Sequence, residues 1–238
     1  MKRFHFVSFI AAAFLMAISC GPVKYTPGDT DIASIGEFAF IEPVSDIMYY
    51  GSKNRPVYDP DLSVASSDFI TSIVSSQRYP FSDVVPMDYE GEDRNIRRWI
   101  QNIGDMPSSK IDRVKVPDGL RDIIASTGYR YGIVIYLNGY VRSREAIRYE
   151  ENQEAVSAVV GAVLDALTKK DDGKDKKPTP TYKSSEKTPY DSNLYCVVID
   201  SEDDRVIHYI HPLPFLEKDP FDGYDMQTML SRLLKDFE

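Results

Sequence analysis

The sequence predicts an α/β fold, in which helices flank a mixed sheet. Two observations support this class: apolar runs rich in β-branched and aromatic residues alternate with segments of helical periodicity, and an evident hairpin precedes a last amphipathic helix. Residues 1–19 and 20–36 have a different character, so the single domain is expected to span residues 37–238.

Two apolar runs in the first half and one near the middle of the chain predict strands. Residues 37–50 are dense enough in apolar side chains for a strand covered on both faces, and residues 81–88 predict a second strand. Residues 129–141 read as a central strand. Asn138-Gly139 inside this run is also a typical hairpin turn, so one long strand and a hairpin both stay open.

Three segments between these runs have the period of a helix. Asp59 followed by Pro60 is a typical helix start, Asp93 can cap a second helix, and Pro117 can open a third that ends at Gly128. The residues expected to face the core are Leu62, Ala65, Phe69, Ile70, Ile73 and Val74 in the first helix, Ile96, Trp99, Ile100 and Ile103 in the second, and Leu120, Ile123 and Ile124 in the third.

The end of the chain predicts a hairpin and a helix. Residues 193–212 contain two alternating strands around an acidic turn at Glu202–Arg205. The helix that follows is expected to bury Met226, Met229, Leu230, Leu233, Leu234 and Phe237.

Two neighbouring segments fit the domain poorly. Residues 154–168 are apolar almost all round, which suits burial in the core, contact with a partner or a second copy, or contact with a membrane. The residues expected at a partner contact are Val156, Val159, Val160, Gly161, Val163 and Leu164. Residues 169–193 are lysine-rich and broken by prolines, so a disordered insertion is expected there.

The first twenty residues have the anatomy of a cleaved signal peptide. Lys2 and Arg3 precede an apolar stretch, residues 6–18, that is shorter than the roughly 20 residues of a membrane-spanning helix. The segment ends on Ser19-Cys20 and resembles a bacterial lipobox. This resemblance implies removal of residues 1–19 and lipidation of Cys20; the alternative is an ordinary signal peptide with an incidental cysteine.

The residues that follow Cys20 indicate where in the cell envelope the protein is expected. Residues 20–36 are polar and are expected to be a tether between the lipid and the domain. Gly21 stands where inner-membrane lipoproteins carry an aspartate, so the resemblance implies the outer membrane, facing the periplasm.

Composition argues against some functions. Removal of residues 1–19 takes away Lys2 and Arg3 and no acidic residue, so the formal charge changes from −9 to −11. An acidic chain is a poor candidate for nucleic-acid binding. No glycine-rich phosphate loop, nucleophile elbow or zinc-helix motif is found, so no cofactor, metal or catalytic residue is assigned.

Two groups of residues have both a functional and a structural interpretation: Cys196 with His211, and the arginines of the second helix. If the hairpin turn centres on Asp203-Asp204, Cys196 pairs with His211 and a cysteine–histidine couple becomes conceivable; a buried cysteine beside a histidine is the simpler interpretation. Arg94, Arg97 and Arg98 lie on the polar side of the second helix, where a solvated face is expected and an anionic partner is the alternative.

Four parts of the chain carry a family resemblance. Residues 126–145, the apolar segment 154–168, the hairpin at 197–209 and the acidic-proline stretch 217–222 resemble uncharacterised envelope lipoproteins of Bacteroidetes. The order of elements is more distantly similar to the α/β module of lipoproteins related to the curli secretion channel and to activators of penicillin-binding proteins.

These resemblances imply a non-enzymatic interaction or assembly factor. Its expected partners are the membrane, through the lipid, and a second copy or another envelope protein. An envelope hydrolase or transferase that uses Cys196 and His211 is the alternative.

Overall fold

The computed structural model confirms an α/β fold with a mixed sheet flanked by helices. It describes residues 23–28, 30–87, 92–104, 106–153, 156–157, 188–211, 215–216 and 218–238. The expected signal peptide, residues 1–19, and Cys20 lie outside this range. Among the described helices, none is long and apolar enough to cross a membrane.

The centre of the fold is one sheet that contains all nine strands found in the described residues. The strands are β1 (Val23–Tyr25), β2 (Phe38–Ile41), β3 (Val44–Tyr50), β4 (Pro56–Tyr58), β5 (Phe81–Val85), β6 (Tyr131–Arg142), β7 (Tyr190–Asp200), β8 (Arg205–His211) and β9 (Phe215–Leu216). The main path runs β1-β8-β7-β6-β2-β5, while β3 also pairs with β6, β4 with β3, and β9 with β7. β2 and β3 run parallel to β6, whereas β7 is antiparallel to it, so the sheet is mixed.

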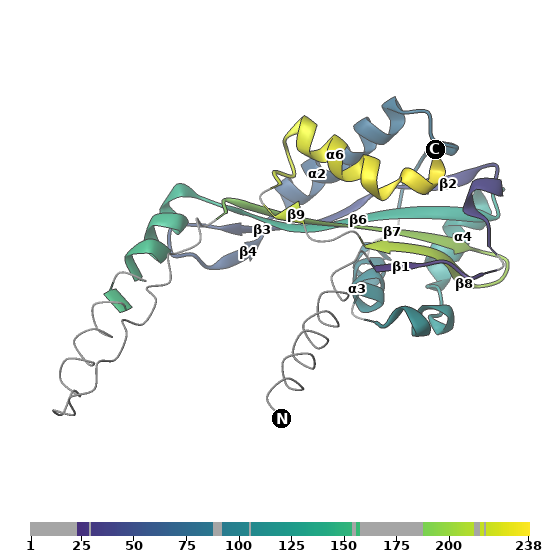
Figure 1. Ribbon diagram of the computed structural model, residues 1–238, viewed down its shortest axis with the longest axis horizontal. Coiled ribbons are helices and arrows are strands. Elements are labelled where there is room, and N and C mark those ends of the chain that lie inside the picture. The colour runs from purple at the N-terminus through teal and green to yellow at the C-terminus, as the bar shows by residue number, and fades with distance from the viewer. Residues whose placement is uncertain are drawn as a thin grey trace, which may run out of the picture.

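Helices cover the sheet on both faces (Figure 1). The α-helices are α2 (Pro60–Ser76), α3 (Glu92–Gly104), α4 (Asp118–Ser126) and α6 (Gly223–Leu233), and the short 3-10 turns are η2 (Ile32–Ser34), η3 (Ser108–Arg113) and η4 (Lys235–Phe237). α2 and α6 lie on one side, and α3 and α4 on the other. Each side encloses its own apolar core, because successive strand residues point to opposite faces of the sheet.

The expected strand at 37–50 is two strands. β2 ends at Ile41 and β3 starts at Val44, with Pro43 between them. Proline has no backbone N–H to donate to a neighbouring strand, so it interrupts pairing at this point. As a result, β2 and β3 pair one after the other with the same long strand, β6.

All three internal helices form where the periodicity predicts them, but the buried face of α2 and the start of α3 differ from the prediction. The Asp59 carboxylate accepts a hydrogen bond from the Leu62 N–H at 3.0 Å and caps α2, as expected. Leu62, Phe69, Ile70, Ile73 and Val74 pack in the core as predicted, but Ala65 is exposed, and Ser63 and Ser66 are buried as well. Ser63 is useful inside because its hydroxyl accepts from the Ile47 N–H at 3.0 Å and joins α2 to β3.

The starts and ends of the later helices differ little from expectation. α3 begins at Glu92, so Asp93 lies within the helix and not at its N-cap. α4 follows Pro117, and Gly128 after it has a φ of +80°, a left-handed conformation that favours glycine. In the last helix all six expected residues are buried, with Phe237 in η4.

The choice at Asn138-Gly139 is settled in favour of one long strand. β6 continues through both residues, which pair with Asn193 and Ser192 of β7. Gly139 is required by this pairing, because a Cβ atom there would lie 2.4 Å from the Asp191 carbonyl oxygen. The hairpin alternative is therefore wrong.

This close approach yields a stability prediction. Gly139→Ala should lower the free energy of unfolding by about 2 kcal/mol, because the backbone of β7 must move away from the new methyl group. Urea denaturation measures the change. Gly51→Ala, where the nearest side-chain atom is 3.7 Å from an added Cβ, serves as the control, and equal losses in the two variants would contradict the argument.

Two expected boundaries need correction. The proposed tether, residues 20–36, contains β1, which pairs antiparallel with β8. The proposed insertion, residues 169–193, lies outside the described residues as far as 187, but Tyr190–Asn193 belong to β7. Backbone pairing in the sheet therefore begins earlier at both sites than composition indicates.

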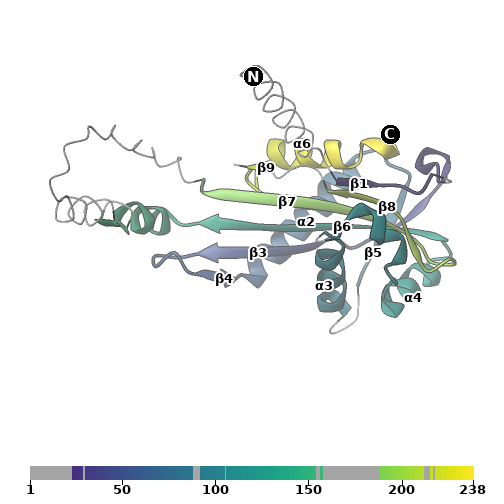
Figure 2. The same cartoon turned by 60° about the horizontal axis from the view of Figure 1, so that its bottom comes forward.

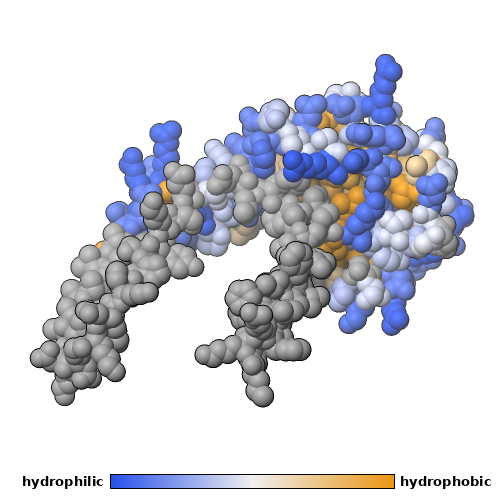
Figure 3. Space-filling view, in the orientation of Figure 1, coloured by the Kyte–Doolittle hydropathy of each residue, from blue (hydrophilic) through white to orange (hydrophobic). Residues whose placement is uncertain are grey.

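The apolar segment 154–168 is described only at 156–157. Residues 144–153 form a helix that extends away from the end of β6, and hydrophilic side chains dominate its visible surface (Figures 1 and 3). Val156 is helical and 63% exposed. The other expected contact residues lie outside the described part of the chain: Val159, Val160, Gly161, Val163 and Leu164.

Candidate functional site

A groove lies on the α3 side of the sheet, where β3, β6 and β7 continue beyond α3 (Figure 2). It consists of two adjoining hollows of about 410 Å³ each, which share Asp46, Tyr58 and Gln101. The arginine hollow adds Arg94, Arg97 and Arg98 of α3. The tyrosine hollow adds, among others, Tyr50, Tyr136, Asn138, Tyr140, Asp191 and Asn193. Sites of this size suit a small polar ligand or a short oligomer.

Asp46 of β3 joins the two hollows. Its carboxylate accepts from Arg97, with which it forms an ion pair, and from the Tyr136 hydroxyl at 2.9 Å. The Gln101 side-chain amide donates to the Tyr136 oxygen at 2.7 Å. Asp46 and Arg97 are about one-fifth exposed, so this network holds the floor of the groove in one geometry.

Arg97 also fixes the boundary between the hollows. Its guanidinium donates to the Ser45 carbonyl oxygen at 2.6 Å and to the Tyr58 hydroxyl at 3.2 Å. The predicted solvated arginine face is therefore wrong for Arg97, whose side chain bridges α3, β3 and β4. Arg94 and Arg98 are exposed and line the same hollow.

Burial, together with the nearby Asp46 carboxylate, raises the pKa of Tyr136 well above its usual range. Tyr136 is thus a neutral hydrogen-bond donor at physiological pH. Burial also raises the pKa of Asp191 at the other end of the groove. The Tyr136 phenol keeps its proton and donates it in a hydrogen bond to the Asp46 carboxylate, which is itself paired with Arg97, so neither Tyr136 nor Asp46 is a free nucleophile.

An aromatic corner closes the tyrosine hollow. The rings of Tyr50 and Tyr140 meet edge to face with centroids 5.4 Å apart. The Arg142 guanidinium lies over both rings, 5.3 and 4.8 Å from their centroids, and pairs with Glu150 at 3.2 Å. The contact between the two rings, the contacts of Arg142 with both rings and the ion pair of Arg142 with Glu150 thus hold the two tyrosines in place before any ligand binds.

Two amides face each other across the floor of this hollow. Asn138 of β6 and Asn193 of β7 are directly paired residues in the antiparallel ladder, so their side chains lie on the same face. Each amide offers a carbonyl acceptor and an NH₂ donor. Asn138 alternates with Tyr136 and Tyr140 along β6, which gives this strand a pattern of ring, amide and ring.

The proposed pairing of Cys196 with His211 is wrong. Asp200 pairs with Arg205, so the hairpin turn centres on Glu202-Asp203 and not on Asp203-Asp204; after a one-residue irregularity between Val198 and Ile199, Cys196 pairs with Ile210. A shift of one residue moves a side chain to the opposite face of a sheet. His211 accordingly stacks on Tyr195 with ring centroids 4.1 Å apart.

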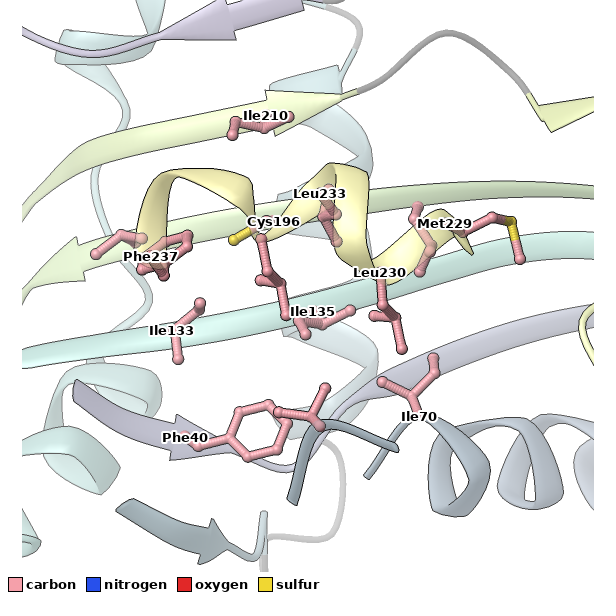
Figure 4. Close-up of a cluster of buried hydrophobic side chains, with 14 of the residues drawn as sticks. Phe40, Ile70, Ile133, Ile135, Cys196, Ile210, Met229, Leu230, Leu233 and Phe237 are labelled. Carbon is pink, nitrogen blue, oxygen red and sulfur yellow. The ribbon is translucent and has the colours of Figure 1, made fainter. Parts of the chain in front are cut away.

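Cys196 itself is a core residue. It is fully buried among Ile210, Leu233 and other apolar side chains beneath α6 (Figure 4). Burial raises the pKa of its thiol, so the reactive thiolate is suppressed. The geometry therefore does not support a hydrolase or transferase built on Cys196 and His211.

A second polar cluster fastens the N-terminal strand to the C-terminal end. Thr26 Oγ1 lies 2.7 Å from Nδ1 of the buried His208, and His208 Nε2 lies 3.3 Å from the Asp236 carboxylate. Lys24 of β1 pairs with the same carboxylate at 2.7 Å. Burial lowers the pKa of His208 to about 4, although Asp236 opposes this shift. No hollow among those described is lined by these four residues.

A metal centre is not assembled by the described residues, in which no group of three potential His, Cys, Asp or Glu ligands is found. His208 and His211 point to different faces of β8. Cys20 and most of the expected partner-contact residues fall outside the description, so the structure neither supports nor opposes them.

The groove was not predicted, although a signal for it exists in the sequence. Tyr136, Asn138 and Tyr140 occupy alternate positions of a strand, as do Asp46, Met48 and Tyr50 of the strand beside it. Polar and aromatic side chains at a period of two indicate a strand face without a helix over it. The contribution of α3 could not be foreseen, because helix placement depends on packing.

The fold and the groove define a class of protein: a mixed α/β domain with a polar, tyrosine-lined groove at one end of its sheet. No known protein family and no curated protein matches the chain. Two solved structures of the PelC dodecamer from Paraburkholderia phytofirmans are similar at TM-scores of 0.32 and 0.33, each with 10% identity. The alignments cover 91% of this chain and 97% and 95% of those chains. A similarity of this size carries no conclusion about function.

Proposed function

We propose that this chain is a lipid-anchored envelope protein whose function is to bind and not to catalyse. Its lipid is attached to Cys20, and its site is the groove. The observation that carries the proposal is that the ionisable groups on the groove floor are bound to one another: Asp46 to Arg97, and Tyr136 to Asp46 and Gln101. Such a network positions a ligand, and none of its members is a free nucleophile or base.

The position of β1 supports anchoring close to the membrane. Only residues 21 and 22 separate Cys20 from β1, and a fully extended chain spans about 3.5 Å per residue. A lipid on Cys20 would therefore hold the β1–β8 edge of the sheet within roughly 10 Å of the bilayer. We place the protein on the periplasmic face of the outer membrane, because Gly21 follows the cysteine.

The exposed Val156 supports a second element of the proposal, contact with a protein partner. The helix that precedes it extends away from the sheet (Figure 1), so it presents its end to other molecules and not to the core. An assembly factor of this kind would hold the groove at the membrane and contact a second copy or another envelope protein through the segment that starts there.

The lipid anchor is tested by changing the two cysteines separately. We expect Cys20→Ala to move the protein from the membrane fraction to the soluble fraction, since anchoring depends on acyl chains whose buried methylenes contribute about 0.8 kcal/mol each. Intact mass spectrometry of the wild-type protein should show acylation and the loss of residues 1–19.

Cys196→Ala is the matched control, because this thiol is buried in the core. It should stay in the membrane fraction with the mass of the acylated chain. Equal membrane association of wild-type and Cys20→Ala protein would overturn the anchor.

A further inference from the structure

We infer that the groove binds an acidic oligosaccharide, in which sugar rings occupy the tyrosine hollow and a carboxylate lies at the arginine hollow. This deepens the proposed binding function and rests on it. The inference comes from three features of the same site: the aromatic rings, the amides between them and the arginines at one end.

The aromatic rings provide surfaces for flat, partly apolar rings. Tyr58 is 43% exposed at the rim, and Tyr50 and Tyr140 form the rigid corner opposite. A sugar ring has C–H faces that pack on an aromatic ring while its hydroxyls stay at the edge. Because these tyrosines are held on strands and by Arg142, little conformational entropy is lost when a ring packs against them.

The amides match the hydroxyls of a sugar. Each hydroxyl both donates and accepts hydrogen bonds, and Asn138 and Asn193 offer both functions from adjacent strands. Within the described residues, no hydrogen bond is found to either side-chain amide, so both are available to a ligand. An apolar ligand would leave these groups unsatisfied, at a cost of about 1–3 kcal/mol each.

The charge of the arginine hollow selects an anion. Among the described residues that line this hollow, Arg94, Arg97 and Arg98 are basic and Asp46 is acidic. Arg97 is used in the network, and Arg98 is exposed at the mouth. A guanidinium binds a planar carboxylate through two parallel hydrogen bonds, which suits a uronic acid.

The same features argue against nucleic acid, whose bases also stack on aromatic rings. A nucleic acid carries a negative charge at every nucleotide and needs a basic track along its whole length. Here the basic residues among the groove's lining all belong to the arginine hollow, and Asp191 lines the other end. The chain as a whole is also acidic, with a formal charge of −9.

Calorimetry on the full chain in detergent tests the inference. The probes are polyuronate oligosaccharides of three to six residues, neutral gluco-oligosaccharides of the same length, and a short oligothymidylate. We expect the polyuronate to bind, to weaken with added salt, and to bind more tightly than either of the other probes.

Variants locate the binding. Arg94→Ala with Arg98→Ala should weaken polyuronate binding about tenfold, the equivalent of one charge-assisted hydrogen bond. Tyr58→Ala should weaken it about fivefold, while Tyr58→Phe, which keeps the ring, should bind nearly as the wild type does.

The matched controls lie on the other face of the sheet: Lys235→Ala in η4 for the arginines, and Tyr224→Ala in α6 for the tyrosine. Both should bind normally. The inference fails if no polyuronate binds, if the neutral probe or the oligothymidylate binds as tightly, or if groove and control variants behave alike. Such a failure is separate from that of the lipid anchor, because membrane association of the Cys20→Ala chain is measured without any saccharide.

Discussion

Phe38→Ala should lower the free energy of unfolding by about 4 kcal/mol, within the range of about 3–5 kcal/mol found for phenylalanine truncations in cores. Phe38 is fully buried at the start of β2. Its ring meets those of Phe81, Tyr131 and Phe237 at centroid distances of 6.0, 6.3 and 5.4 Å. Truncation removes all three contacts at once and leaves a cavity that rigid strands cannot close.

The loss should be visible in urea denaturation as a lower midpoint with an unchanged slope. Tyr224→Ala is the control, since that side chain is 76% exposed, and its midpoint should change little. A loss below about 1 kcal/mol for Phe38→Ala would mean that the neighbouring rings collapse into the space. The contact with Phe237 further predicts that the C-terminal turn η4 loosens, which hydrogen exchange of its amides would report.

The layers of this fold were predictable because they follow from local patterns. The α6 helix is a clear example: its buried residues recur with the helical period, and all of them face the core. The pairing of strands that lie far apart in the sequence could not be predicted in the same way. Pro43 divides the first apolar run, yet only the structure shows that both pieces pair with β6, because parallel pairing has no turn that would define its register.

The hairpin shows how small an error changes a functional conclusion. Its two strands were predicted correctly, but the turn centres on Glu202-Asp203 in place of Asp203-Asp204, so that even after the irregularity between Val198 and Ile199 the register differs by one residue from the predicted one. That single step separates Cys196 from His211 by the thickness of the sheet. Bulges of this type depend on tertiary packing and leave no reliable mark on a sequence.

The groove required the same kind of long-range information. Tyr136 and Asp46 are 90 residues apart and meet only because β3 lies beside β6. Arg97 belongs to a helix whose position over the sheet is decided by the apolar contacts of Ile96, Ile100 and Ile103. The three arginines and their two interpretations are evident in the sequence, but the carboxylate of Asp46 that holds Arg97 is not.

A further expected result concerns acid. The protein should lose stability as the pH falls from about 6.5 to about 4, and His208 should account for about 3 kcal/mol of this loss. The sign follows from the lowered pKa. In this interval the unfolded chain binds a proton at His208 and the folded chain does not, so acid favours unfolding. Above pH 6.5 neither state binds the proton, and the contribution is constant.

The surroundings of His208 explain why the folded state excludes the proton. The side chain is 1% exposed, and burial disfavours the charged imidazolium. Lys24 adds a positive charge nearby, while Asp236 acts in the opposite direction. Thr26 contacts Nδ1 of His208, and Lys24 pairs with Asp236. Protonation of His208 would therefore disturb the contacts that hold β1, the strand that follows Cys20.

The measurement is the free energy of unfolding at several pH values between 5 and 7.5, for the wild type and for His208→Gln. The variant should show a flatter profile, because it lacks the group that titrates, and other ionisable groups cancel in the difference between the two profiles. NMR should place the titration of His208 in the folded protein near pH 4.

Lys24→Met provides the sharper comparison. It removes the positive charge and leaves Asp236 as the charged neighbour, so the pKa of His208 should rise and the acid-sensitive interval should become narrower. Relative to the intrinsic exchange rate at each pH, the protection of the amides that pair β1 with β8 should fall on acidification in the wild type and much less in His208→Gln. Identical pH profiles for the wild type and His208→Gln would show that the folded protein accommodates the imidazolium, and β1 would then be held independently of pH.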